Sequence, residues 1–208
     1  MTGRGAVLTV AAMFVACQSD KAARVDFSET ARHYTEADYH DVYERWTRHD
    51  FVMFDVEKAL EVWATFKSWD WREAYIERYA SVYSLSEGDR SKLRAGQLSA
   101  LHDAYEFNLT AQSANYKWND LEKQSSPWRI TLLDALGHEL QVDAAVIKVQ
   151  KLPEPYEREF FPAKTPFTKM YSVRFVAPAN SEFVGIKSGS IILRIASPVG
   201  RIELTWRA

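Results

Sequence analysis

One stripe of large apolar side chains, repeated at intervals of three and four residues, marks the start of the folded part of the chain. The stripe consists of Tyr39, Val42, Tyr43 and Trp46. This spacing places all four side chains on one face of an α-helix. Thr35, with Asp38 three residues later, is typical of the polar cap that opens a helix. The pattern therefore predicts an amphipathic helix that begins close to Thr35.

Three more helices are expected before residue 124. Residues 52–66 carry one apolar face at helical spacing, formed by Val56, Leu60, Trp63 and Phe66. Asp70 is expected to cap a third helix, whose inward-facing residues are Ala74, Tyr75, Tyr79 and Val82. Ser86, with Asp89 at the third helical position, marks a fourth helix that runs through Leu93, Gln97, Leu101 and Ala104. Four helices joined by short connections predict a small bundle.

The periodicity changes at about residues 125–127, where apolar and polar residues begin to alternate. Strands are predicted over residues 128–133, 140–149, 171–176, 190–195 and 201–206. Turn signals separate them at 134–137 and 197–200, and a connection rich in proline covers 151–168. Short strands divided by turns suggest an antiparallel sandwich.

Helices first and strands second indicate the α+β fold class. We expect an N-terminal helical bundle at residues 28–124, followed by an antiparallel immunoglobulin-like β-sandwich at residues 127–208. The strand pattern of the second part resembles the immunoglobulin-like accessory modules that are common on exported bacterial proteins. A likeness of fold implies no function. Whether the two parts pack as one domain is left open by the sequence.

The first 17 residues have the pattern of an export signal. Arg4 gives a short positive start, residues 6–15 form an apolar run, and Ala16 precedes Cys17. A basic start, an apolar core of 7–15 residues and a small residue at the end are typical of a secretory signal peptide, whereas a membrane-spanning helix needs about 20 apolar residues.

The tail of this signal, Phe14-Val15-Ala16-Cys17, resembles the lipobox of bacterial lipoproteins. The resemblance implies that residues 1–16 are removed and that Cys17 is diacylated, becoming the new N-terminus. Two or more acyl chains hold a protein stably to a bilayer. Residues 17–27 would then be the lipidated cysteine and its tether. Gln18 in place of an aspartate favours the outer membrane over the inner one in enterobacterial lipoproteins.

Two alternatives to lipidation follow from the same residues. The first alternative is an ordinary signal peptide, whose removal would release a secreted protein without a lipid. It could also be a buried N-terminal strand that ends in cysteine. Cys17 is the only cysteine of the chain. An unpaired cysteine is unusual in an exported protein, and acylation would account for it.

Composition excludes several classes of partner. The formal charge is −2, and removal of Arg4 with the signal peptide lowers it to −3. A chain this close to neutral, without a basic patch, is not expected to bind nucleic acid. A single cysteine provides no disulfide framework, so the core alone must stabilise the fold.

Glu36, His40 and Glu44 are the strongest metal candidates in the sequence. They lie four residues apart, so they share one face of the first predicted helix. Two carboxylates beside an imidazole can hold a divalent cation. The spacing matches no closed zinc pattern, and a solvated polar helix face explains the same residues better. We therefore expect no metal and no cofactor.

Sequence signatures of catalysis are missing. The chain has no Gly-x-Ser-x-Gly elbow, no phosphate-binding loop and no cysteine apart from the expected acylation site. His102 and Asp103 are neighbours on a predicted helix, so their side chains do not face one another. A pair of carboxylates for glycoside hydrolysis is neither supported nor excluded.

Trp63, Trp69 and Trp71 form the only candidate binding surface. Residues two apart cannot both face one helix core, so at least one of Trp69 and Trp71 is expected at a surface or an interdomain contact. An exposed tryptophan patch can bind sugar rings or a partner protein. The alternative is that these residues join the helical part to the sandwich.

The sequence thus predicts a lipid-anchored protein of the bacterial cell envelope, with the outer membrane favoured over the inner one. Its expected role is a non-enzymatic interaction or assembly module. Its expected partners are the membrane, through the lipid, and an envelope protein. The alternative from another class is a periplasmic hydrolase or carbohydrate-binding protein.

Overall fold

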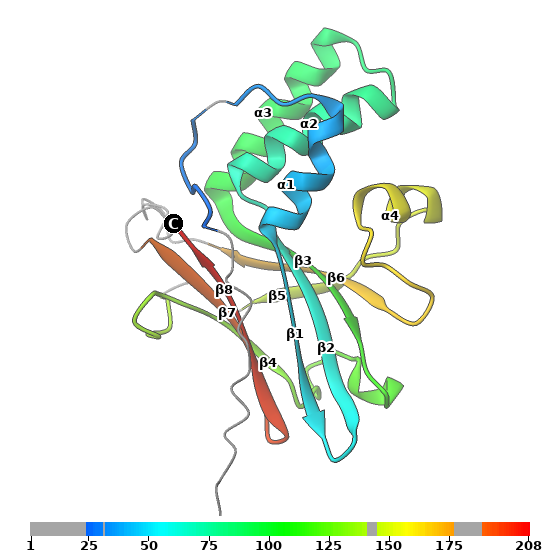
Figure 1. The fold of residues 1–208 in the computed structure, drawn as a ribbon, viewed down its shortest axis with the longest axis vertical. Coiled ribbons are helices and arrows are strands. Elements are labelled where there is room, and N and C mark those ends of the chain that lie inside the picture. Colours follow the sequence, from blue (N-terminus) through cyan, green and yellow to red (C-terminus); the bar gives the residue numbers. More distant parts are fainter. Residues whose placement is uncertain (1–23, 31, 141–144, 177–188) are drawn as a thin grey trace, which may run out of the picture.

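The fold of the protein comes from a computed structural model, which describes residues 24–30, 32–140, 145–176 and 189–208. Figure 1 shows a mixed α+β architecture in which helices gather at one end and long strands extend away from them. The helices are α1 (Tyr39–Trp46), α2 (Trp69–Val82), α3 (Glu87–Asp103) and α4 (Glu154–Phe160), with short 3-10 helices at η1 (Glu36–Asp38) and η2 (Tyr116–Trp118). The expected α+β class is confirmed.

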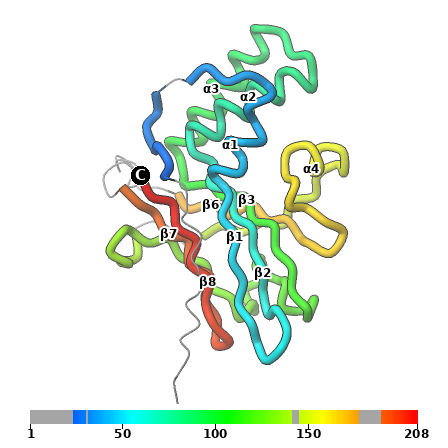
Figure 2. Tube along the Cα trace, viewed as in Figure 1, coloured from blue at the N-terminus to red at the C-terminus, as the bar shows by residue number. Residues whose placement is uncertain are grey.

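The strands form two antiparallel sheets. They are β1 (Thr47–Phe54), β2 (Glu57–Phe66), β3 (Ala104–Gln112), β4 (Arg129–Leu133), β5 (Val146–Val149), β6 (Lys169–Val176), β7 (Ser190–Ser197) and β8 (Gly200–Arg207). The five-stranded sheet has the order β1-β2-β3-β6-β5, and the three-stranded sheet has the order β4-β7-β8. The Cα trace in Figure 2 follows the same path through both sheets.

The first predicted helix is confirmed as η1 followed by α1. Tyr39, Val42, Tyr43 and Trp46 are all buried, as their spacing indicates. Thr35 Oγ1 donates to Asp38 Oδ2 at 2.7 Å, so the expected polar cap forms at the start of this segment. The predicted aromatic stripe therefore packs into the core.

The predicted helix at residues 52–66 is wrong, because this segment is the turn and second strand of the β1–β2 hairpin. Asp55 adopts a positive φ of 54° at the turn. Seven of the last eight residues of β2 are buried, because helices or other core elements cover both faces of the strand. An apolar run buried on both faces cannot be told from a helix by periodicity alone.

The third and fourth predicted helices exist as α2 and α3. Trp71 N donates to Ser68 Oγ at 3.1 Å, so Ser68 is the N-cap of α2 and the expectation for Asp70 is wrong. Asp89 N donates to Ser86 Oγ at 3.2 Å, which confirms the cap of α3. Ala74 and Tyr75 are buried as expected, whereas Val82 is 44% exposed because α2 extends beyond the core at its end.

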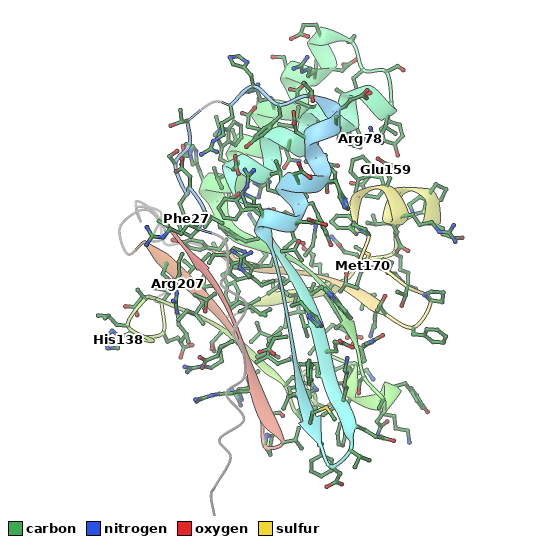
Figure 3. The ribbon with its side chains drawn as sticks, viewed as in Figure 1. Phe27, Arg78, His138, Glu159, Met170 and Arg207 are labelled. Atoms are coloured by element: carbon green, nitrogen blue, oxygen red, sulfur yellow. The ribbon has the colours of Figure 1, made fainter. Side chains whose placement is uncertain are left out.

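The five strands predicted in the second part correspond to β4, β5, β6, β7 and β8, although residues 141–144 lie outside the described residues. The connection at 151–168 contains a helix, α4, which was not predicted because the prolines of this segment were interpreted as marks of a loop. Arg78 Nε of α2 lies 2.5 Å from Glu159 Oε1 of α4, and Figure 3 shows this pair at the interface of the two helices.

The expected order of a helical bundle followed by an immunoglobulin-like sandwich is not the arrangement observed. Three strands, β1, β2 and β3, lie within residues 28–124. β3 then pairs with β6 along eight residues of each strand, so one sheet takes strands from both parts of the chain. The reason is long-range pairing, which local periodicity does not encode.

The two sheets meet along β1 and β8, which run side by side in opposite directions but belong to different ladders. Trp206 Nε1 donates to Trp46 O at 2.8 Å, and Arg48 Nε donates to Thr205 O at 2.9 Å. Between the sheets lies an aromatic core that includes Phe66, Phe107 and Trp206. We call this contact between β1 and β8 the seam.

Residues 24–30 lie against this core and the end of β8. Val25 N donates to Arg207 O at 2.7 Å, and the ring of Phe27 lies 5.7 Å from that of Trp46. Figure 3 shows Phe27 close to Arg207. Among the residues that the structure describes, no helix combines the length and the apolarity needed to cross a membrane.

Candidate functional site

The three candidate tryptophans do not form one surface. Trp69 and Trp71 are both buried, so neither of them lies at a surface, and of the two expected positions only the contact between parts of the chain stays a prediction. The reason is that the first eight residues of α2, Trp69 to Ile76, are buried on every side of the helix. Trp71 stacks on Tyr75 with ring centroids 5.1 Å apart. Only Trp63, on β2, reaches solvent.

Trp63 lies on one face of the β1–β2 hairpin, in a small group of side chains that contact one another. The strand register places His49 directly opposite Trp63, and their rings stack with centroids 4.6 Å apart. His49 Nε2 lies 2.9 Å from Glu61 Oε1. We call His49, Glu61 and Trp63 the Trp63 group.

Glu61 is the buried anchor of the Trp63 group. Lys58 Nζ donates to Oε1 at 2.5 Å, and Gln112 Nε2 donates to Oε2 at 2.5 Å. Burial alone would raise the pKa of the Glu61 carboxyl, but the hydrogen bonds from Lys58, Gln112 and His49 outweigh it and hold the pKa below its usual value. Glu61 is therefore an ionised acceptor that orients the imidazole of His49.

The Trp63 group has side chains suited to binding a polar or sugar ligand. Among the described residues, it lacks a nucleophile that would complete a catalytic site. An oriented imidazole can accept a proton or bind a hydroxyl group, and an indole can stack on a sugar ring. Within the part of the chain that the structure describes, the hydrogen-bond partner of the His49 ring is Glu61, and no serine, threonine or cysteine contacts it in this way. Sequence reasoning found Trp63 but missed Glu61, whose signal was a carboxylate inside the apolar run of residues 59–66.

The metal candidates are dispersed. Glu36 accepts a hydrogen bond from Ser81 and lies 3.7 Å from Arg78 of α2. His40 and Glu44 form an exposed pair at 3.2 Å. Across the described ranges, no group of three or more histidine, cysteine, aspartate and glutamate side chains is placed to hold a metal ion. The Glu36 carboxylate is thus paired with two side chains of α2.

A group of exposed apolar residues lies at the end of the β1–β2 hairpin. We call four of its residues the hairpin patch: Phe51, Met53, Phe54 and Val56. Their exposed fractions are 43%, 44%, 46% and 89%. Figure 1 shows this hairpin end far from α1, α2 and α3. The ring of Phe54 contacts Trp118 of η2, with centroids 5.7 Å apart, so the patch continues onto a second element.

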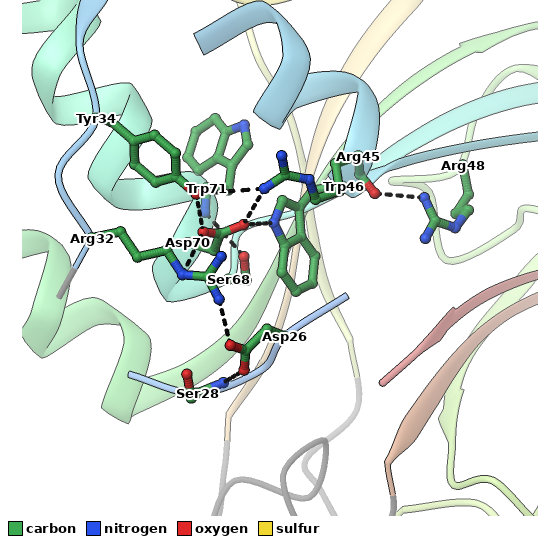
Figure 4. Close-up of polar contacts among 10 residues, drawn as sticks. All are labelled: Asp26, Ser28, Arg32, Tyr34, Arg45, Trp46, Arg48, Ser68, Asp70 and Trp71. Atoms are coloured by element: carbon green, nitrogen blue, oxygen red, sulfur yellow. Dashed lines mark hydrogen bonds and ion pairs between the residues drawn. The ribbon is translucent and has the colours of Figure 1, made fainter. Parts of the chain in front are cut away.

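A buried carboxylate, Asp70, joins the N-terminal segment to α1 and α2. Trp46 Nε1 donates to it at 2.7 Å, Arg45 NH1 at 3.3 Å and Arg32 Nε at 3.2 Å, and the Tyr34 hydroxyl donates as well. Figure 4 shows these donors converging on the carboxylate. The side chain is 2% exposed, so it has no room for a ligand. Its role is structural.

A second buried network surrounds Glu106 of β3. Arg72 NH2 lies 2.8 Å from Glu106 Oε2, Arg174 Nε lies 3.3 Å from Oε1, and Lys67 Nζ lies 3.9 Å from Oε2. The pKa of Lys67 is lowered to about 8, mainly by burial; Glu106 opposes this change and the neighbouring charge of Arg72 adds to it. Three cations thus share one carboxylate between the sheet and α2.

Comparison with known proteins finds no relative. No family model matches the chain, and neither a curated protein nor a solved structure is significantly similar to it. Cys17 and the signal residues 1–16 lie outside the described residues.

Proposed function

We propose that this chain is a lipid-anchored protein of the bacterial cell envelope and that it serves as a non-enzymatic interaction module. Cys17 would carry the anchor, with the outer membrane favoured over the inner one. The partners would be the membrane, through the lipid, and one envelope protein. The hairpin patch is the observation that carries the interaction part of this proposal.

The hairpin patch supports a protein contact because four exposed large apolar side chains lie within six residues of one another at the end of one hairpin. Scattered exposed hydrophobic residues are ordinary, but a contiguous group commonly marks an interaction site. Four of the ten most exposed large hydrophobic residues in the described part of the chain lie on this single hairpin. Aromatic residues and methionine are also enriched at protein interfaces.

The anchor is supported by the lipobox-like tail and by the position of the first described residues. Val25 is fixed against β8, and seven positions separate Cys17 from Arg24. An extended chain spans roughly 3.3–3.6 Å per residue, so such a tether would reach about 25 Å at most. A body on this tether stays close to the membrane and meets partners within the same envelope.

The anchor is tested by intact mass and membrane fractionation of the protein beside a Cys17→Ala variant. We expect the wild type to begin at Cys17, to carry acyl mass and to pellet with membranes, whereas the variant remains in the supernatant. A wild type that is unmodified at Cys17 and soluble would contradict the anchor and leave the interaction surface to be judged separately.

The interaction surface is tested by placing a photo-cross-linking residue at Phe54 or Val56 in the lipidated protein. Tyr83, which is 48% exposed and lies at the C-terminal end of α2, is the matched control position. We expect an adduct of one and the same mass from both patch positions and none from Tyr83. Adducts of many masses, or equal yield from all three positions, would contradict a specific patch.

The Trp63 group supports a second candidate function, which is carbohydrate binding or hydrolysis in the periplasm. The observation in its favour is the stack of His49 on Trp63 with Glu61 behind it. A panel of envelope glycans tests it by binding and by product release. Retention of a glycan by the wild type, lost in Trp63→Ala, would favour this candidate over the interaction module.

A further inference from the structure

A cleft of about 560 Å³ opens beside η2, next to the hairpin patch. Its chemistry comes from charged and aromatic side chains, chiefly Tyr116, Lys117, Asp120, Lys123, Phe167 and Lys169. These residues come from η2, the chain that follows it, the turn before β6 and the first residue of β6. Sites for small molecules in proteins typically have volumes of about 300–1,000 Å³. The cleft has the size of a binding site.

The charge of the cleft is positive. Lys169 Nζ lies 2.7 Å from Glu122 Oε1 and 3.3 Å from Asn119 O, so this ammonium is already occupied. Lys117 and Lys123 form no ion pair within 4 Å among the residues that the structure describes. The one carboxylate on the cleft wall is Asp120, which accepts a hydrogen bond from Ser126 at 3.0 Å. The lining therefore contains three ammonium groups and one carboxylate, and Glu122, the partner of Lys169, also attracts Lys123.

Two aromatic rings stand at the cleft with most of their surface in solvent. Tyr116 is 79% exposed and Phe167 is 86% exposed. Phe167 lies in a turn with a fixed shape, since Thr165 N donates to Thr168 Oγ1 at 2.9 Å and Phe167 N donates to Thr165 Oγ1 at 3.3 Å. A rigid turn that holds a phenyl ring in water provides apolar surface for a ligand.

We propose that this cleft binds a small organic anion that carries a flat apolar group, such as an aromatic carboxylate or a phosphate monoester. Lys117 and Lys123 bind the anionic group through charge-assisted hydrogen bonds. Tyr116 and Phe167 cover the flat group. The proposal assigns the cleft a free ligand rather than a lipid headgroup, and it goes beyond the interaction module without depending on it.

Amide chemical shifts of the full-length Cys17→Ala protein test the proposal, because they detect weak binding. The probes are phenyl phosphate, inorganic phosphate and phenol, each titrated at constant ionic strength. We expect phenyl phosphate to shift the amides of residues 113–123 and 165–169 and to bind at least about fivefold more tightly than either other probe, because only it engages both features. Equal binding of inorganic phosphate would overturn the proposal.

A double variant, Lys117→Gln with Lys123→Gln, tests the residues that hold the anion. Both side chains are exposed, so the fold is retained, and circular dichroism verifies it. We expect about tenfold weaker binding of phenyl phosphate. Lys92→Gln, at an exposed lysine of α3, is the matched control and leaves binding unchanged. Unchanged affinity in the double variant would overturn the assignment.

Vesicles of phosphatidylglycerol distinguish the source of the anion. We expect the Cys17→Ala protein not to pellet with them while phenyl phosphate still binds. The proposal of a free ligand would be overturned if the Cys17→Ala protein pelleted with these vesicles and did not bind phenyl phosphate, and if the double lysine variant no longer pelleted.

Discussion

At the scale of single residues, the buried charges of this protein are each satisfied by several partners. Asp70 receives donors from the N-terminal segment and from α1, and Glu106 shares its two oxygens among three cations. Removing one member of a buried ion pair leaves an uncompensated charge, which is costlier than the pair is stabilising. These residues therefore fix the positions of α1 and α2, and replacing one of them is expected to lower the free energy of unfolding strongly.

Asp70→Asn is expected to lower the free energy of unfolding by about 3 kcal/mol. The new amide nitrogen would face a donor, either Trp46 Nε1 or the Tyr34 hydroxyl, where an acceptor is required. Urea unfolding measures the change. Glu154→Gln removes an exposed carboxylate paired with Arg158 and should change stability by less than about 0.5 kcal/mol. Similar values for the two variants would contradict a structural role for Asp70.

Lys67 predicts a pH dependence whose sign follows from its lowered pKa. The folded-state pKa is about 8, below the unfolded value of about 10.4, so the unfolded chain binds more protons between these values. The contribution of Lys67 to stability therefore rises with pH across this window. We expect the wild type to gain about 1–2 kcal/mol relative to Lys67→Met between pH 7.5 and pH 9.5. Lys92→Met should show no such difference, and a flat or falling difference for Lys67→Met would contradict the prediction.

At the scale of elements, the seam between β1 and β8 depends on side chains rather than on a ladder. Arg48 donates to Thr205 O, Arg45 O and Thr47 O at 2.7–2.9 Å, and its guanidinium lies over the ring of Trp206. Burial lowers the pKa of Arg48, but those carbonyl acceptors compensate the charge. The turn between β7 and β8 also approaches β1 closely, because Gly200 has no side chain.

Gly200→Ala is expected to destabilise the protein by about 2 kcal/mol. A Cβ at this position would lie 2.3 Å from Val52 Cγ2, and the residue has a φ of +150° that favours glycine. Gly96→Ala is the matched control, because nothing lies within 4 Å of its Cβ position inside α3. That variant should gain about 0.5–1 kcal/mol, since alanine favours a helix.

The cause of the Gly200→Ala effect is tested by the double variant with Val52→Ala. Removing the Val52 methyl groups should recover part of the lost stability. If Gly200→Ala is neutral in thermal unfolding, β1 and β8 do not approach as closely as the seam requires.

At the scale of the whole molecule, pairing of β3 with β6 joins the two parts of the chain into one sheet. β2, β3 and β8 contribute the aromatic side chains Phe66, Phe107 and Trp206 to the same core. Neither part can therefore bury its apolar surface without the other. The strands connect α1, α2 and α3 at one end of the molecule to the hairpin patch at the other (Figure 1).

Urea unfolding should consequently proceed in one transition. Tryptophan fluorescence and far-ultraviolet circular dichroism are expected to give coincident curves, as in small two-state proteins. The fragment of residues 127–208 alone should lack cooperative unfolding. Two separate transitions, or a stably folded fragment, would contradict the shared sheet.

Features that depend on neighbours along the chain could be inferred before the fold was known. The stripe of Tyr39, Val42, Tyr43 and Trp46 predicted α1, Ser86 predicted the start of α3, and alternation predicted β6, β7 and β8. Local spacing and capping are encoded within a few residues, so no fold is needed to infer them. Of the candidate surface, Trp63 alone was found at a partly exposed position.

Features that depend on residues far apart in sequence could be recognised only in the folded protein. β2 looked helical because both of its faces are buried, and burial on two faces removes the alternation that marks a strand. The structural role of Asp70 was missed because its partners, Tyr34 and Trp46, are far from it in sequence and lie outside α2. The hairpin patch and the cleft beside η2 depend on β1, η2 and the turn before β6, which the fold brings together, so the sequence did not reveal them.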